Sequence, residues 1–221
     1  GVYDYWRQGI TGSATRRRVV HVGTKVLSDA DDGSFATTLF TGLAAGAVPH
    51  YSTFDDRLIV ASDNVLDVPK TWDQTTAANL GGTPPRFSFT AVHHNRVWAA
   101  GDFANPSRLY YSANVDPQDW VGAGSGTIDI DPDDGDMITG IASHRNILFV
   151  FKGPNKGAIH QITGSAPTGS DAFARKTYST GLGCSWQNAI FRYGDELGFV
   201  SQLGTVHNLS ATASFGDFLE T

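Results

Sequence analysis

The sequence offers little sulphur chemistry, because it contains one cysteine and one methionine among 221 residues. A single cysteine excludes an intramolecular disulfide, so packing and hydrogen bonds must stabilise the fold. No histidine stands beside Cys184 in a pattern typical of a nucleophile. We therefore interpret Cys184 as a small buried apolar side chain.

Long apolar runs and a strong positive charge are also missing. No stretch is long enough to cross a bilayer as a helix, so no membrane insertion is expected. Charged residues make up 17% of the chain and the net charge is −6, which disfavours broad attachment to nucleic acid. The triplet Arg16-Arg17-Arg18 is a local exception, which we interpret as the solvated end of a strand rather than a nucleic-acid contact.

The amino terminus shows neither an initiator methionine nor the basic and apolar regions of a signal peptide. This favours an internal piece of a longer polypeptide.

Glycine is abundant, at 25 residues, and a short motif recurs three times. The copies are FDDRLIVA at residues 54–61, HHNRVWAA at 93–100 and SHRNILFV at 143–150. Each is a polar turn followed by an apolar run, which is typical of a hairpin between two short strands. We interpret Arg57, Arg96 and Arg145 as equivalent residues at the start of the second strand of three consecutive units.

A second repeated pattern is Pro-x-x-Trp, at residues 69–72 and 117–120. Trp72 follows its repeat arginine more closely than Trp120 does, and we attribute the difference to an inserted loop at residues 101–108. Insertions into repeat units usually lie in loops. We therefore expect deletion of residues 102–107 to leave the unit intact.

Units that recur every 40 to 50 residues predict an all-β fold, a β-propeller-like array of about five four-stranded units. The units span about 1–46, 47–85, 86–135, 136–183 and 184–221, within a single domain over residues 1–221. Hairpins are expected at 18–28 and at 57–68, and a last strand at 213–219, with at most a short helix at 211–218. A β-sandwich with long connections stays open as an alternative.

The run DIDPDDGD at residues 129–136 is the best candidate for a metal site, because alternate carboxylates can converge on Ca²⁺. It departs from the helix-loop-helix calcium pattern: Gly135 comes one place late, Gly140 replaces the bidentate glutamate, and Pro132 stiffens the loop. We interpret Asp129–Asp136 as a connection between units whose Asp side chains cap backbone amides.

No other group of residues predicts chemistry. His93 and His94 should point to opposite faces of a strand, and His144 aligns with Asn95 in a turn. The glycines at 122–126 lack a phosphate-loop lysine, residues 181–185 are not a nucleophile elbow, and nothing selects two carboxylates for glycoside hydrolysis. We predict no catalytic, cofactor-binding or metal-binding residues, no cofactor, and a protein that is not an enzyme.

The stretch NPSRLYYS at residues 105–112, followed by DPQDW at 116–120 and IDIDPDDGD at 128–136, resembles structural proteins of tailed bacteriophages with propeller-like domains. Residues 146–152, 160–164 and 181–185 strengthen the likeness, which covers about residues 95–210. The broader similarity is to tail hub, nozzle and stabilisation proteins of short-tailed phages.

The resemblance implies a virion structural protein located in the tail or at the head–tail junction, where it is a connector component assembling into a homo-oligomeric ring. Its partners would be portal, adaptor or tail proteins, and phage double-stranded DNA would pass without tight binding. We expect assembly contacts at residues 101–108 and 122–126. The alternatives are a receptor- or glycan-binding propeller, with Trp72, Trp120 or Trp186 stacking on sugars, and a glycosidase.

Overall fold

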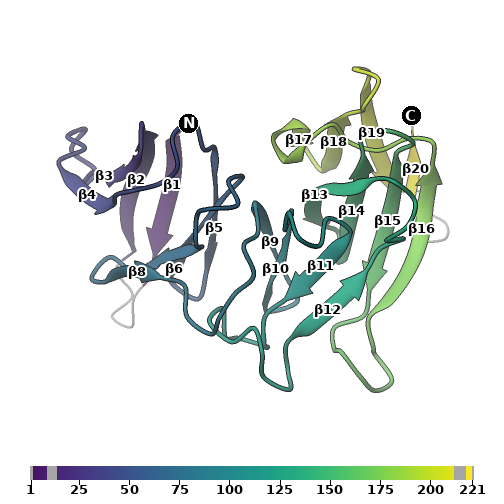
Figure 1. Cartoon of the computed structure of the whole chain (residues 1–221), viewed down its shortest axis with the longest axis horizontal. Helices are drawn as coiled ribbons and strands as arrows, with labels where there is room; N and C mark the ends of the chain where they lie inside the picture. The colour runs from purple at the N-terminus through teal and green to yellow at the C-terminus, as the bar shows by residue number, and fades with distance from the viewer. Residues whose placement is uncertain (1, 9–13, 212–217, 221) are drawn as a thin grey trace. The chain divides into compact units, whose positions relative to one another are not determined.

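The computed structural model describes residues 2–8, 14–211 and 218–220, and it is built almost entirely from strands. The strands form five sheets of four strands each, with antiparallel pairing between neighbours (Figure 1). The expectation of an all-β fold with five four-stranded units is therefore confirmed. Among the described residues the only helix is the 3-10 helix η1 (Gln187–Ala189), and no helix there is long and apolar enough to span a membrane.

The sheets follow one another along the chain. The first contains β1 (Val2–Arg7), β2 (Thr15–Val22), β3 (Lys25–Ser28) and β4 (Thr37–Phe40). The second contains β5 (Pro49–Phe54), β6 (Arg57–Ser62), β7 (Lys70–Trp72) and β8 (Ala77–Asn79). The third contains β9 (Phe89–His93), β10 (Arg96–Ala100), β11 (Arg108–Tyr111) and β12 (Gly126–Asp129). The fourth contains β13 (Met137–His144), β14 (Ile147–Gly153), β15 (Ala158–Thr163) and β16 (Ala174–Thr180). The fifth contains β17 (Ile190–Tyr193), β18 (Glu196–Val200), β19 (Val206–Ala211) and β20 (Phe218–Glu220).

The chain divides into two compact units. One comprises residues 1–103 with 111–126, and the other comprises residues 104–110 with 127–221. The first compact unit contains the first two sheets together with β9 and β10, and the second contains the fourth and fifth sheets.

Two-residue turns join the first and second strands in four of the sheets. The residue pairs that close these turns are Phe54↔Arg57, His93↔Arg96, His144↔Ile147 and Tyr193↔Glu196. In the first three, both turn residues have positive φ, between 45° and 67° for Asp55, Asp56, His94, Asn95, Arg145 and Asn146. A right-handed strand twist favours such turns in hairpins, and Asn and Asp tolerate the left-handed conformation best. The repeated polar pair in the motif is therefore the turn itself.

The turn positions correct the alignment of the third motif copy. Arg57 and Arg96 each begin a second strand, as expected, but Arg145 lies in its turn, where it is equivalent to Asp55 and His94. Ile147 occupies the place of the two arginines, and His144 is equivalent to His93 rather than to Asn95. The sequence alignment was wrong because it matched the arginines instead of the turns.

The predicted hairpin at 57–68 is also wrong in its second strand. The third strand of that sheet is β7, and residues 63–68 form a loop held by the Asp67 carboxylate. Asp67 accepts hydrogen bonds from the Ser62 hydroxyl (2.6 Å) and from the backbone N–H of Ala44 (2.9 Å). The hairpin predicted at 18–28 is confirmed, with Gly23 at a φ of 63° in its turn. The helix or strand predicted within 211–219 lies largely outside the described residues.

Cores form where consecutive sheets pack face to face. In the first compact unit, Tyr5, Val19 and Phe40 of the first sheet pack against Leu58, Val60 and Trp72 of the second. The rings of Tyr5 and Trp72 lie 5.4 Å apart between their centroids. A four-stranded sheet must bury its apolar face in this way, because it is not stable alone.

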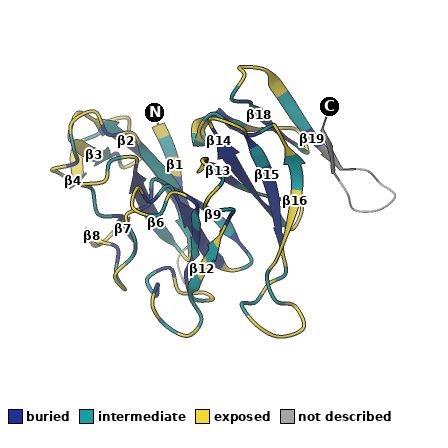
Figure 2. Ribbon diagram, turned by 45° about the vertical axis from the view of Figure 1, so that its right-hand side comes forward, coloured by how far each residue is buried: buried dark blue, intermediate teal, exposed yellow. Residues whose placement is uncertain are grey.

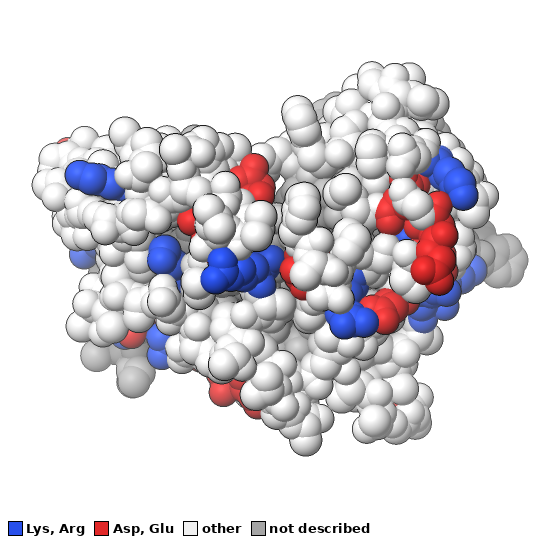
Figure 3. Space-filling model, in the orientation of Figure 1, with Lys and Arg blue, Asp and Glu red and all other residues white. Residues whose placement is uncertain are grey.

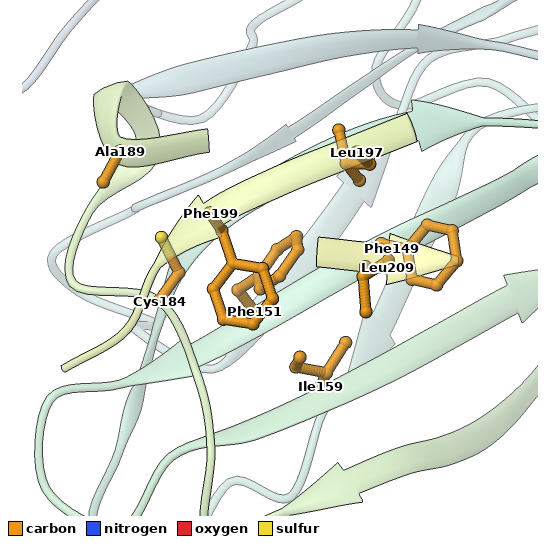
Figure 4. Close-up of a cluster of buried hydrophobic side chains, with 8 residues drawn as sticks. All are labelled: Phe149, Phe151, Ile159, Cys184, Ala189, Leu197, Phe199 and Leu209. Atoms are coloured by element: carbon orange, nitrogen blue, oxygen red, sulfur yellow. The ribbon is translucent and has the colours of Figure 1, made fainter. Parts of the chain in front are cut away.

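The second compact unit repeats this arrangement. Phe149, Phe151 and Ile159 of the fourth sheet pack against Leu197, Phe199 and Leu209 of the fifth, with Cys184 at the edge of the cluster (Figure 4). The rings of Phe151 and Phe199 are 5.1 Å apart. Figure 2 shows β14 and β15 as the most continuously buried strands of this sheet. Cys184 is thus a core side chain, as the sequence indicated.

Polar side chains also connect the first strand of a sheet to the next part of the chain. The hydroxyls of Ser52 and Thr90 lie 2.8 Å apart. In the second compact unit, Gln187 donates from Nε2 to the carbonyl of Ile141 (3.0 Å) and accepts from its N–H at Oε1 (2.7 Å). One amide side chain therefore satisfies both backbone groups of a β13 residue.

We expect Gln187→Ala to lower the free energy of unfolding by about 1–3 kcal/mol, because it leaves two backbone groups of Ile141 without partners. Urea denaturation followed by tryptophan fluorescence would measure this. Asn188→Ala, at an exposed position of the same 3-10 helix, is the control and should change stability by less than about 0.5 kcal/mol. Equal effects of the two substitutions would contradict the role of Gln187.

Candidate functional site

The acidic run connects the third and fourth sheets. Asp129 ends β12, Ile130 is fully buried, and residues 131–136 lead into β13. Facing this loop is Lys152 of β14, whose side chain is completely buried. A buried ammonium is stable only when oxygen atoms surround it, so the lysine and the loop must be considered together.

The Lys152 ammonium lies among four oxygen atoms. Its Nζ is 2.7 Å from the carbonyl oxygens of Ile130 and Asp131, 2.7 Å from Asp134 Oδ1 and 3.3 Å from the hydroxyl of Ser107. Carbonyl and carboxylate oxygens are also the ligands that Ca²⁺ prefers. The lysine charge therefore occupies the place among these oxygens that a metal ion would need.

Three other carboxylates of the loop, those of Asp129, Asp131 and Asp136, have protein partners as well. Arg175 Nη1 lies 2.5 Å from Asp131 Oδ1, and Arg108 binds both oxygens of Asp129 at 2.6 and 2.9 Å. Asp136 accepts three backbone N–H groups, those of residues 155, 156 and 157, at 2.7–2.9 Å. The run is thus a connection between sheets, and Asp136 binds backbone N–H groups as predicted for its Asp side chains.

These contacts change the protonation of the loop. Burial by itself would raise the pKa of Asp134, but hydrogen bonds from Lys152 and from the Asp136 N–H outweigh it and hold the pKa below its usual value. The hydrogen bonds from Arg108 lower the pKa of Asp129. Burial lowers the pKa of His160, although Asp131 Oδ2 lies 3.5 Å from its ring. At neutral pH Asp129 and Asp134 are therefore ionised and His160 is neutral.

The described part of the chain contains no group of three or more His, Cys, Asp or Glu side chains that could hold a metal ion. Sequence reasoning identified the loop but missed Lys152. The available signal was a single lysine inside the otherwise apolar stretch ILFVFKG of β14, because an unpaired lysine is almost never buried.

Residues 104–110 belong to this site, which corrects the expectation of a dispensable insertion. The Ser107 carbonyl accepts from Ile130 N–H (2.9 Å), and the Pro106 carbonyl accepts from Ile138 N–H (2.8 Å). The Ser107 hydroxyl donates to the Asp136 carbonyl at 2.9 Å. Deleting 102–107 would remove the backbone partners of the buried Ile130 and Ile138, so we now expect the deletion to destabilise the unit.

The glycine-containing stretch at 122–126 is attached to the repeat arginine of β10. Arg96 is buried and donates from Nη1 to the carbonyls of Ser112 (2.8 Å) and Gly124. Asp119 accepts the N–H of Gly122 at 2.7 Å. Arg96 therefore bridges a loop of its own sheet, as predicted for the repeat arginines, and Arg145 reaches the Asp195 carbonyl at 3.1 Å.

The remaining candidate nucleophile, Cys184, and the candidate base His93 are buried. Burial raises the pKa of the Cys184 thiol to about 11 and lowers the pKa of His93 to about 4. The rings of His93 and His94 lie 4.1 Å apart, so the expectation that they diverge was wrong: His94 is in the turn, outside the alternation of the strand. A thiol with a raised pKa is a poor nucleophile at neutral pH.

The three tryptophans considered for sugar stacking separate into two kinds. Trp72 and Trp120 are buried, whereas Trp186 is 66% exposed. Trp72 lies in β7 and Trp120 in the loop after β11, so the two Pro-x-x-Trp motifs do not mark equivalent positions. Only Trp186 of these three is available to a ligand.

Comparison with known proteins adds no relative. No protein-family model matches the chain, and no curated protein sequence matches it. The fold and the loop define an all-β protein of repeated four-stranded sheets in which a buried lysine holds an acidic connection.

We expect Lys152→Met to destabilise the protein by about 1–3 kcal/mol, because two carbonyls and the partly exposed Asp134 carboxylate lose their donor. Lys156→Met is the matched control at an exposed position of the same sheet's hairpin, and it should change stability little. Denaturant titration of both variants measures the difference. A Lys152→Met protein as stable as the control would contradict the role assigned to this lysine.

The lowered pKa of Asp134 predicts acid sensitivity. A carboxyl with a lower pKa in the folded state stabilises the fold above its unfolded pKa, about 4, and this contribution is lost as pH falls through the folded value. The stability difference between wild type and Asp134→Asn should therefore shrink between about pH 5 and pH 2. Asp133→Asn, at an exposed neighbour, is the control. A difference that grows on acidification would refute this assignment.

Proposed function

We propose that this chain is a non-enzymatic structural protein of a tailed-phage virion, a tail or head–tail connector component that assembles into a ring. The observation that carries the proposal is the acidic loop itself. Its carboxylates are bound by the buried Lys152 and, at the surface, by Arg175 and Arg108, which favours a structural role for this loop over a chemical one. The virion assignment is motivated by the sequence resemblance proposed for residues 95–210.

The repeated packing of consecutive sheets supports a propeller-like arrangement, in which each sheet is one blade. Tyr5 against Trp72 and Phe151 against Phe199 are the same kind of face-to-face contact in two parts of the chain. Such an array is a rigid platform, and its function lies in what its surfaces bind.

The charge distribution supports passage of DNA without tight binding. Figure 3 shows basic and acidic side chains in small mixed groups on a largely uncharged face. With a net charge of −6, the protein gains little from releasing counterions on DNA. The proposed partners are other copies of the chain and the portal, adaptor or tail proteins.

The alternative is a receptor- or glycan-binding propeller, and the exposed Trp186 is the observation that favours it. Aromatic faces can stack on sugar rings. In that case Trp186→Ala would abolish binding to host envelope polysaccharide and leave the oligomeric mass unchanged.

We expect the purified protein to form a discrete oligomer of several copies, measured by native mass spectrometry or light scattering. Antibodies against the chain should label the tail or the head–tail junction in electron micrographs of particles. A protein that stays monomeric at all concentrations, or label confined to the capsid surface, would contradict the connector proposal.

A further inference from the structure

The face of the fourth sheet that is opposite its aromatic core carries titratable side chains. Phe149 and Phe151 pack in the core with the fifth sheet, so the alternate residues of β14 form the other face. Lys152 lies on that other face. His160 of β15 lies there as well, because it pairs with Val150, which is two residues from Lys152. Side chains related in this way are diagonal neighbours on two adjacent strands.

The edge strand β16 adds a second cation to this face. Thr177 is the strand partner of His160, and Arg175 lies two residues before Thr177 on the same side of the strand. The acidic connection, residues 130–136, lies against the cluster. Arg175 Nη1 is 2.5 Å from Asp131 Oδ1, and Lys152 Nζ is 2.7 Å from the Asp131 carbonyl oxygen. The connection is therefore attached to both β14 and β16.

His160 is fully buried between these two attachments, because β15 lies between β14 and β16. Its Nδ1 is 3.3 Å from the Thr177 hydroxyl, and its Nε2 is 3.5 Å from Asp131 Oδ2. Within the described part of the chain Nε2 makes no hydrogen bond, so the carboxylate lies near the ring without binding it. A charged imidazolium is unfavourable at a buried position of this kind.

The charges of the cluster balance only while His160 is neutral. Two cations, Lys152 and Arg175, contact one carboxylate each, Asp134 at 2.7 Å and Asp131 at 2.5 Å. A proton on His160 would add a third positive charge to two negative ones. Burial lowers the pKa of this ring most; Asp131 opposes the effect, Arg175 and Lys152 lower the pKa further, and Asp134 opposes it weakly. These groups face the ring from β14, from β16 and from the connection.

We propose that His160 is an acid-sensitive switch, whose protonation releases the acidic connection from β14 and β16 while the aromatic core of the same compact unit stays packed. Release of the connection exposes the ring to water, which hydrates the imidazolium and screens it from the two cations. The inference goes beyond the proposed function, because it holds whether or not the protein assembles into a ring.

The direction of the pH response follows from the lowered pKa of His160. A histidine with a lower pKa in the closed state stabilises that state above its open-state pKa, about 6.5, and the contribution is lost as pH falls from there toward the closed-state value. The response therefore begins at milder acidity than the loss of the Asp134 contribution.

Hydrogen exchange followed by mass spectrometry tests this inference. Between about pH 7.5 and pH 5, after correction for intrinsic exchange, protection of residues 130–137 should fall by up to about thirtyfold, the limit for an open-state pKa of about 6.5. The Asp136 N–H reports release directly, since it bonds Asp134 Oδ1 at 2.9 Å. Residues 148–151 of the core should lose far less protection. A parallel loss in both segments would mean that acid unfolds the whole unit, and it would overturn the switch.

His160→Gln separates this ring from the other titrating groups. Glutamine gains no proton in this pH range, so the loss of protection at residues 130–137 should disappear. His144→Gln is the matched control: His144 is also buried in this compact unit with a pKa lowered by burial, but it lies at the end of β13 far from the connection. The control should respond as the wild type does. An unchanged response in His160→Gln would refute the assignment.

A titration of the wild type by NMR needs no substitution. The ring resonances of His160 should report a pKa below the ordinary value of about 6.5, and the Asp136 amide resonance should shift over the same pH range. A His160 pKa at or above that ordinary value would overturn the proposal, even if His160→Gln failed to fold.

Discussion

Each four-stranded sheet of this protein must cover an apolar face with the next sheet, and the rest of the structure follows from that constraint. A sheet of this size does not bury enough surface to be stable alone. Tyr5 and Phe151 illustrate the solution, since each lies between two consecutive sheets and contacts an aromatic ring of the partner. Polar side chains such as Gln187 of the 3-10 helix then attach the next part of the chain to the first strand of a sheet.

The connection between the third and fourth sheets explains why a lysine is buried. Where the chain leaves the third sheet and enters the fourth, carbonyls and carboxylates converge beneath β14, and Lys152 supplies three N–H donors there. A buried ion pair adds little net stability compared with an apolar core but is costly to break. Lys152 therefore specifies one path for the connection at residues 130–136.

Strands and turns were largely predictable, because they depend on local patterns. Strand residues alternate, and polar pairs such as Asp55-Asp56 mark the tight turns that only a few residue types tolerate. The errors came from residues whose roles are set by distant partners. Arg145 was aligned with Arg57 by residue type, and residues 101–108 were taken for an insertion although Ser107 supports the buried Ile130.

Composition and repeats were enough to predict an all-β chain of five four-stranded units without disulfides. Strand periodicity and turn residues can be recognised within short stretches of the sequence. They could not distinguish a capping loop from a metal loop, since the deciding atom, Lys152 Nζ, comes from a strand later in the chain. Nor could they separate the buried Trp72 and Trp120 from the exposed Trp186. Burial and charge pairing depend on which sheets lie next to each other, and that is a property of the folded chain.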